Sequence, residues 1–186
     1  MSKSVMLSIR PKWCEKICRG EKTIEVRKTR PKLETPFKCY IYRTKGTVPH
    51  IINDKWVQME VGGTVIGEFT CDRIYKIDKD STDFLFKAGG LSVYKQAAEE
   101  KCGLRVAMTD DELHGYLGHC QGYGWHISDL VVYDEPKELI EFHTWKKCKS
   151  CSKSGYESTA CIYDENCMVP VAITKAPQSW CYVEEM

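Results

Sequence analysis

The chain has 186 residues, of which 42% are hydrophobic and 28% charged, and its formal net charge is +1. This composition excludes a disordered or low-complexity protein and suits one folded domain with a small appendage. No stretch approaches the ~20 apolar residues that a membrane span needs. The first ten residues lack the apolar core of a signal peptide, so we expect an intracellular, cytoplasmic protein.

Charge is unevenly distributed along the chain. Residues 1–50 hold 13 Lys and Arg against 4 Asp and Glu, whereas residues 51–186 hold 14 against 22. The basic first segment either presents a local surface to an anionic partner or pairs with acidic groups of the second segment. The sequence leaves both alternatives open, because nearness in sequence does not show that charges share a face.

The first predicted elements are a strand, a helix and two further strands. The short apolar run 5–9 predicts a strand, and the segment 11–19 predicts a helix that starts at a proline and ends at Gly20. The alternating segments 22–27 and 38–43 predict two more strands. A basic loop that contains prolines joins these two strands.

The middle of the chain adds a long strand and two helices. A glycine pair precedes a strand predicted to run to about Ile77, within which Gly67 indicates a bulge or a close backbone approach. Two helical segments follow, and the second begins with Thr109 and Glu112 in capping-box spacing. Strand character returns over residues 122–136.

This order of elements decides between fold classes. Helix and strand do not alternate regularly, which argues against a doubly wound parallel sheet. We expect a mixed α+β protein, built as a small mixed β-barrel with helices packed at its rim. The main domain should span residues 1–142 and a cysteine-rich extension residues 143–181, with 178–186 returning as a final strand.

Eleven cysteines are many for a chain of this length, but their odd number argues against a secreted disulfide scaffold. Cys148-x-x-Cys151 has the spacing of half a zinc site. Cys167 and Cys181 are the predicted other half, and Cys161 with Cys167 is the alternative. Such a Zn²⁺ would be structural and would stabilise an extension with little core of its own. Five free or buried thiols are the other interpretation.

The segment GEKTIEVRK, residues 20–28, carries five charged residues on a strand-like alternation. If Ile24 and Val26 face the core, Glu25 and Arg27 share the opposite face. On an exposed face this pair would contribute little. In a cleft, Glu25 would orient the guanidinium and leave donors for a phosphate or a base edge.

Other residues could complete such a cleft. Lys22 is expected in the turn before the strand rather than buried with the apolar residues, so that its ammonium reaches the same cleft. Arg10 is a second candidate cationic contact, and Trp13 could stack on a base. His126 and Ser128 share a strand face and could contact a base edge. Each of these residues also has an ordinary structural interpretation, as surface or core.

Gly20, Lys22, Glu25 and Arg27 match the pattern Gly-x-Lys-x-x-Glu-x-Arg, which is characteristic of the ASCH domain family. The preceding LSIRPKWCEKICRG resembles the same family, with an apolar strand, an Arg-Pro turn and a helix. YGWHISDL and PQSWCYVEE resemble a longer, prophage-type subgroup. The resemblance implies a PUA-like β-barrel that binds RNA or a nucleotide-like ligand in a cleft beside the barrel.

The resemblance also implies an enzyme hypothesis. Some small bacterial members are amidohydrolases that act on N4-acetylcytidine with a lysine, a threonine and a glutamate. Lys22 matches the lysine, whereas Glu25 stands at the threonine position, so binding is placed ahead of catalysis. The hypotheses are a binding protein for RNA or a modified nucleotide, a hydrolase (amidohydrolase or ribonuclease) centred on Lys22 and Glu25, and a protein-interaction adaptor.

Overall fold

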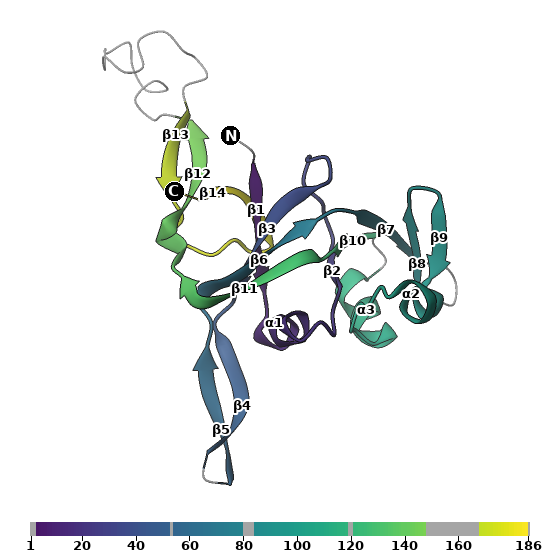
Figure 1. Cartoon of the computed structure of the whole chain (residues 1–186), viewed down its shortest axis with the longest axis horizontal. Helices are drawn as coiled ribbons and strands as arrows, with labels where there is room; N and C mark the ends of the chain where they lie inside the picture. The colour runs from purple at the N-terminus through teal and green to yellow at the C-terminus, as the bar shows by residue number, and fades with distance from the viewer. Residues whose placement is uncertain (1–2, 53, 80–83, 119–120, 148–167, 186) are drawn as a thin grey trace.

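The computed structural model describes residues 3–52, 54–79, 84–118, 121–147 and 168–185. Within these ranges the chain forms three β-sheets, three α-helices and one short 3-10 helix, so the predicted mixed α+β class is confirmed (Figure 1). None of the helices in the described ranges is long and apolar enough to cross a membrane.

The largest sheet has seven strands in the order β11-β6-β3-β1-β14-β12-β13. They are β1 (Ser4–Ile9), β3 (Phe37–Arg43), β6 (Thr64–Cys71), β11 (Ser128–Lys137), β12 (Phe142–Lys147), β13 (Met168–Ala172) and β14 (Trp180–Glu185). β1 lies between parallel β3 and antiparallel β14. All six of its residues are buried, which explains why its sequence is nearly continuously apolar instead of alternating.

A second sheet has the order β2-β10-β7-β8-β9, and a third consists of two strands that pair only with each other. The second sheet contains β2 (Ile24–Arg27), β7 (Ile74–Lys79), β8 (Phe84–Ala88), β9 (Leu91–Tyr94) and β10 (Gly122–His126), and the third contains β4 (Gly46–Ile52) and β5 (Lys55–Val61). The helices are α1 (Pro11–Cys18), α2 (Lys95–Cys102), α3 (Asp110–Leu117) and the 3-10 helix η1 (Leu139–Glu141).

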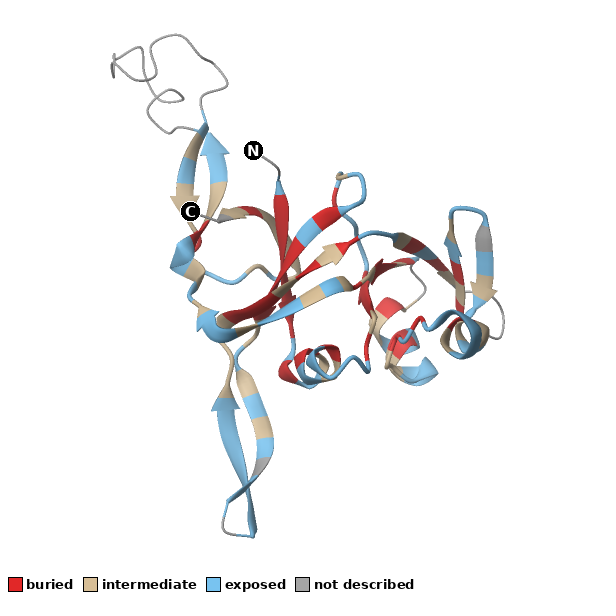
Figure 2. Cartoon of the chain, in the orientation of Figure 1, coloured by how far each residue is buried: buried red, intermediate tan, exposed pale blue. Residues whose placement is uncertain are grey.

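The described residues form three apolar clusters, two of which adjoin β2, and Figure 2 shows buried residues in red along the strands and in parts of the helices. In the first cluster, Cys14 and Ile17 of α1 pack with Leu7 of β1 and with Trp125 of β10. In the second, residues of β2, β7 and β8 pack against α2 and α3. β2 lies where these two clusters meet, because its Ile24 and Val26 belong to the second cluster while Trp125 of its neighbour β10 belongs to the first.

Several predicted elements are confirmed with small shifts in their bounds. The first helix begins at the predicted proline, and Gly20 follows it with φ +71°. The Thr109 hydroxyl accepts from the Glu112 backbone N–H at 3.1 Å, and the Glu112 carboxylate accepts from the Thr109 N–H at 3.0 Å. A Cβ at Gly67 would lie 2.4 Å from the Val131 carbonyl oxygen, which is the predicted close backbone approach.

Other expectations on secondary structure were wrong. The strand predicted to run unbroken to Ile77 divides after Cys71 into β6 and β7, which belong to different sheets. A single alternating pattern cannot reveal this break, because both halves alternate in the same way. Residues 46–52 and 55–61, for which we predicted no element, form the paired strands β4 and β5.

The C-terminal segment returns to the main sheet. β14 is the expected final strand, and it pairs with β1 on one side and with β12 on the other. β12 also pairs with β13. The structure thus describes the two ends of the predicted extension, and both ends continue the seven-stranded sheet. Residues 148–167, the middle of that predicted extension, lie outside the described residues.

Candidate functional site

A cleft of about 640 Å³ lies beside β2. Its lining residues come from four parts of the chain. The start of α1 contributes Arg10, Lys12 and Trp13, and β2 with the turn before it contributes Lys22, Glu25 and Arg27. α3 and the residues just before it contribute Met108, Glu112 and Tyr116, and the loop before β14 contributes residues 177–179. The structure thus brings together five of the seven predicted ligand-contacting residues, from two neighbouring parts of the N-terminal segment.

The alternation of β2 places its charged residues in this cleft. Ile24 and Val26 are buried in the second apolar cluster, as the sequence predicted. Glu25 and Arg27 point the other way and line the cleft, although both are also largely buried, at 6% exposed each. The expectation that this face is a cleft wall, and not an exposed surface, agrees with the geometry.

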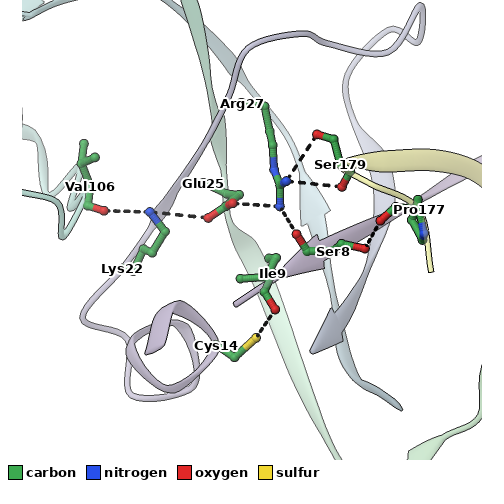
Figure 3. Close-up of polar contacts among 9 residues, drawn as sticks. All are labelled: Ser8, Ile9, Cys14, Lys22, Glu25, Arg27, Val106, Pro177 and Ser179. Carbon is green, nitrogen blue, oxygen red and sulfur yellow. Dashed lines mark hydrogen bonds and ion pairs between the residues drawn. The ribbon is translucent and has the colours of Figure 1, made fainter. Parts of the chain in front are cut away.

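Three charged side chains form a continuous chain along the cleft wall (Figure 3). The Lys22 ammonium lies 3.5 Å from one carboxylate oxygen of Glu25, and the Arg27 guanidinium lies 3.0 Å from the other. Both cations therefore share one carboxylate. Glu25 is the group on which this arrangement depends, because without it two buried cations would lie close together with no negative charge to compensate them.

Lys22 differs from the expectation. It was predicted to stay out of the buried layer, yet it is 2% exposed, and its ammonium donates to the Val106 carbonyl oxygen at 2.8 Å. The carbonyl and Glu25 satisfy the ammonium, which is why a lysine is tolerated there. Burial, partly opposed by the Glu25 charge, lowers the pKa of Lys22 below its ordinary 10.5.

Arg27 braces the wall of the cleft. Its guanidinium donates to the Ser8 carbonyl oxygen at 2.8 Å and to the carbonyl and hydroxyl oxygens of Ser179 at 3.3 and 3.4 Å (Figure 3). Its Nε is buried and has no hydrogen-bond partner among the described residues. Of the predicted spare donors of Arg27, only this buried Nε is left without a partner in the described part of the chain. Its terminal nitrogens instead tie β2 to β1 and to the loop before β14.

The mouth of the cleft is more exposed. Arg10 is exposed and makes no ion pair or side-chain hydrogen bond within the part of the chain that the structure describes. Lys12 pairs with Glu112 at 2.6 Å. Arg10 is therefore the cation that can meet an anionic group without giving up a partner.

Aromatic rings contribute to two sides of the cleft. The Trp13 ring has the ammonium groups of Lys12, Lys16 and Lys22 at 4.5, 5.3 and 5.3 Å from its centroid. Tyr116 lies on α3, and burial raises the pKa of its phenol, which keeps the hydroxyl protonated. An indole surrounded by cations can stack on a flat ring that carries a neighbouring negative charge.

His126 and Ser128, also predicted to contact a ligand, are not among the residues that line the cleft. The His126 ring nitrogen Nδ1 lies 2.6 Å from the Asp72 carboxylate, at the turn between β6 and β7. The Ser128 hydroxyl donates to the Thr70 carbonyl oxygen at 2.9 Å. Both side chains thus have structural partners at the end of β6.

The sequence did not single out Met108, Tyr116 or the loop 177–179 as parts of the cleft. Tyr116 and Met108 come from a helical region whose amphipathic pattern gives no sign of a ligand. Pro177 accepts a hydrogen bond from the Ser8 hydroxyl at 2.5 Å, which seats the loop against β1. The segment PQSWCYVEE, which contains this loop, was recognised only through its resemblance to a family.

The predicted zinc site falls largely on residues that the structure does not describe. Cys148, Cys151, Cys161 and Cys167 lie outside the described residues, and no cluster of potential ligands is found among the described ones. Cys181 lies in β14, where burial raises its thiol pKa to about 11. The site stays a prediction, which a metal assay of the purified protein would test.

Replacing Lys22 with methionine should change how stability depends on pH. Because the folded protein binds the Lys22 proton less tightly than the unfolded chain does, unfolding takes up a proton at pH values between the lowered pKa and 10.5. The free energy of unfolding of the wild type should therefore rise relative to that of Lys22→Met as the pH increases through this window. Urea denaturation of both proteins from neutral pH to about pH 10 would measure the difference.

The control for this experiment is Lys28→Met, which removes an exposed lysine from the same segment. A wild-type stability that stays constant or falls relative to Lys22→Met would contradict the lowered pKa.

Neither the protein-family models nor the curated proteins match this chain. Among solved structures, the chain is similar to the crystal structure of ASCH from Zymomonas mobilis, with 17% sequence identity, a TM-score of 0.49 and 73% of both chains covered. Crystal structures of two point mutants of that protein are similar as well. They have 16% and 17% identity and TM-scores of 0.47 and 0.48, and cover 73% of this chain and 76% and 74% of theirs.

Proposed function

We propose that this protein binds RNA or a modified nucleotide in the cleft beside β2. The observation that carries the proposal is the combination of charge and aromatic surface in one cavity. Among the described lining residues are four Lys and Arg side chains, two carboxylates and the Trp13 ring. Cationic grooves with aromatic platforms bind single-stranded nucleic acid because the phosphates meet the cations while the bases stack.

The dimensions and layout of the cleft support the same proposal. A volume of about 640 Å³ lies within the range of small-molecule and cofactor sites, which is ~300–1,000 Å³. In this arrangement the exposed Arg10 receives a phosphate at the mouth. Trp13 stacks on the base, and the buried Lys22–Glu25–Arg27 chain offers a carboxylate and an ammonium to polar groups on the edge of the base.

The sequence motif adds a second line of support. Gly20, Lys22, Glu25 and Arg27 match the characteristic ASCH pattern, and three of these residues form the charged chain of the cleft. On this basis we propose an ASCH-type, PUA-like domain of the longer, prophage-type subgroup. A PUA-like arrangement would account for a ligand site at the side of a strongly bent sheet with helices at its rim.

Substitution of Trp13 by alanine should weaken the binding of RNA by ~5- to 150-fold, because stacking on an aromatic side chain is worth ~1–3 kcal/mol per base. The measurement is fluorescence anisotropy with a short labelled single-stranded RNA. Trp145→Ala is the control, since Trp145 is partly exposed on β12 and does not line the cleft. Equal losses in both variants, or no loss in Trp13→Ala, would contradict the proposal.

The phosphate contact can be tested in the same assay. Arg10→Ala should weaken binding and lower the slope of log affinity against log salt by ~0.7, the value for one phosphate contact on a single strand. Arg19→Ala removes the same charge at the other end of α1 and is the matched control. An unchanged slope in Arg10→Ala would show that this residue does not contact phosphate.

A hydrolase is the second candidate, and one observation favours it. Lys22 is buried and lies 3.5 Å from the Glu25 carboxylate, which places an amine and an acid–base partner side by side, and burial lowers the pKa of Lys22 below its ordinary 10.5. Hydrolysis of N4-acetylcytidine would consume water and release cytidine and acetate. Acetate release, or cleavage of a short RNA, that is lost in Lys22→Ala would support this hypothesis. The absence of turnover by the wild type would remove it.

A further inference from the structure

The loop that joins β2 to β3, residues 28–36, begins at the edge of the cleft (Figure 1). Arg27, the last residue of β2, lines the cleft, and Lys28 is the first residue of the loop. The Lys28 ammonium lies 5.5 Å from the centroid of the Tyr116 ring, which also lines the cleft. The loop therefore carries positive charge from the cleft wall onto the neighbouring surface.

The first half of this loop is fixed against β14, the strand that follows the last loop lining the cleft. The Thr29 hydroxyl accepts a hydrogen bond from the Trp180 indole N–H at 2.9 Å, and the Lys32 backbone N–H donates to the Tyr182 hydroxyl at 2.8 Å. Pro31, between these two contacts, is buried. The loop and β14 thus form one continuous surface beside the cleft, held together by contacts within the chain.

Three cations of the fixed stretch are available to a partner. Lys28, Arg30 and Lys32 are exposed, and none of them makes an ion pair within the ranges that the structure describes. Lys12 at the mouth of the cleft, by comparison, pairs with Glu112 at 2.6 Å. The loop holds a single acidic residue against its three cations. These cations can therefore meet an anionic partner without breaking an ion pair.

Two aromatic rings lie among these cations. Trp180 and Tyr182 are half-buried neighbours on β14, with ring centroids 5.4 Å apart. Their contacts with Thr29 and Lys32 place them beside the cationic loop. A surface that combines cations with aromatic rings favours single-stranded nucleic acid over an acidic peptide, because bases stack on the rings while phosphates meet the cations.

We propose that this surface binds the part of an RNA strand that extends beyond the nucleotide in the cleft. Five residues form the surface, which we call the outer track: Lys28, Arg30, Lys32, Trp180 and Tyr182. The inference rests on the proposed function and makes its ligand more specific. The ligand is then a single strand of several nucleotides that occupies the cleft and the outer track together, whereas a free nucleotide occupies the cleft alone.

The length of the outer track sets how many phosphates it can meet. The extended chain from Ser179, which lines the cleft, to Tyr182 on β14 spans ~10 Å. Consecutive phosphates of a stacked strand are ~3.4 Å apart along its axis, so the outer track can meet about three of them, one for each cation. Each phosphate contact on a single strand adds ~0.7 to the slope of log affinity against log salt, so the outer track should add ~2.

Fluorescence anisotropy of the full chain with two labelled single-stranded RNAs of mixed sequence tests the proposal. One RNA is a dinucleotide, which is too short to cover both the cleft and the outer track, and the other is a decanucleotide. The decanucleotide should bind more tightly, with a salt dependence that is steeper by ~2. The triple variant Lys28→Ala, Arg30→Ala, Lys32→Ala should lose this extra slope and keep the wild-type affinity for the dinucleotide.

The matched control removes three charges from other parts of the surface. Lys55 on β5, Lys101 on α2 and Lys146 on β12 are exposed, do not line the cleft, and make no ion pair among the described residues. Replacing all three with alanine changes the net charge by the same amount and should leave the salt dependence of decanucleotide binding close to that of the wild type. Thermal melting would show that both triple variants fold, which is expected because all six side chains are exposed.

The possible results separate the outer track from the cleft. Equal affinity for the two RNAs would overturn the outer track and leave nucleotide binding in the cleft intact. Equal losses in both triple variants, or no loss in the first, would overturn it as well, because binding would then not depend on these three cations. Polyglutamate that displaces the decanucleotide as effectively as unlabelled RNA of the same charge would assign the surface to acidic polypeptides instead. If neither RNA binds, the proposed function of the cleft fails, and the outer track fails with it.

Discussion

Replacing Glu25 with alanine is expected to destabilise the protein by about 3–5 kcal/mol, the cost of removing one partner from a buried ion pair. Its carboxylate is the shared partner of Lys22 and Arg27, at 3.5 and 3.0 Å. Without it, an ammonium and a guanidinium that are both almost fully buried would lie in the same wall with no negative charge between them. Urea denaturation at neutral pH would measure the loss.

The control is Glu34→Ala, which removes an exposed carboxylate from the loop that follows β2. It should leave the denaturation midpoint close to that of the wild type. A Glu25→Ala protein as stable as this control would mean that other groups compensate the charges of Lys22 and Arg27. The ion pairs of Glu25 would then not be needed for stability. Glu25→Gln separates charge from shape, because it keeps the side chain and removes only the negative charge.

Replacing Arg27 with lysine should cost about 2–4 kcal/mol of stability, even though the positive charge is retained. A single ammonium cannot reach Glu25, Ser8 and Ser179 together, and hydrogen bonds to charged groups are worth about 1.5–3 kcal/mol each. The loop 177–179 would lose its attachment to β2. If the cleft binds RNA as proposed, RNA binding should weaken as well, because this loop lines the cleft.

Thermal melting and RNA anisotropy on the same Arg27→Lys preparation would separate the two effects. Arg73→Lys, which replaces an exposed arginine between β6 and β7, is the matched control. Retention of both stability and binding in Arg27→Lys would contradict the bracing role. Loss of stability with full binding in the surviving folded fraction would show that the loop is not part of the binding surface.

Local patterns predicted the local structure well. Alternation around Ile24 and Val26 placed Glu25 and Arg27 on the correct face, and the Thr109–Glu112 spacing gave a real capping box. These features depend only on neighbouring residues. Gly67 was recognised for a similar reason, because glycine within a strand commonly marks a place where another backbone comes near.

Structural features that depend on contacts between residues far apart in the sequence could not be predicted. The burial of Lys22 requires the Val106 carbonyl, 84 residues away, and without this acceptor a lysine at that position would be expected in solvent. His126 and Ser128 were wrongly predicted to share a strand face, because His126 ends β10 of the second sheet whereas Ser128 begins β11 of the seven-stranded sheet. The β4–β5 hairpin was not predicted because a proline and several polar residues interrupt its apolar pattern.

The brace between Arg27 and Ser179 joins residues 152 positions apart, and it has a consequence for biosynthesis. As the chain leaves the ribosome, the loop that completes the wall follows the motif at residues 20–27 only after a further 152 residues have been made. Contacts of such high sequence separation form late. A nascent chain would therefore carry the whole motif throughout that interval without an assembled cleft, and a ligand would meet a complete cleft only after Ser179 has been made.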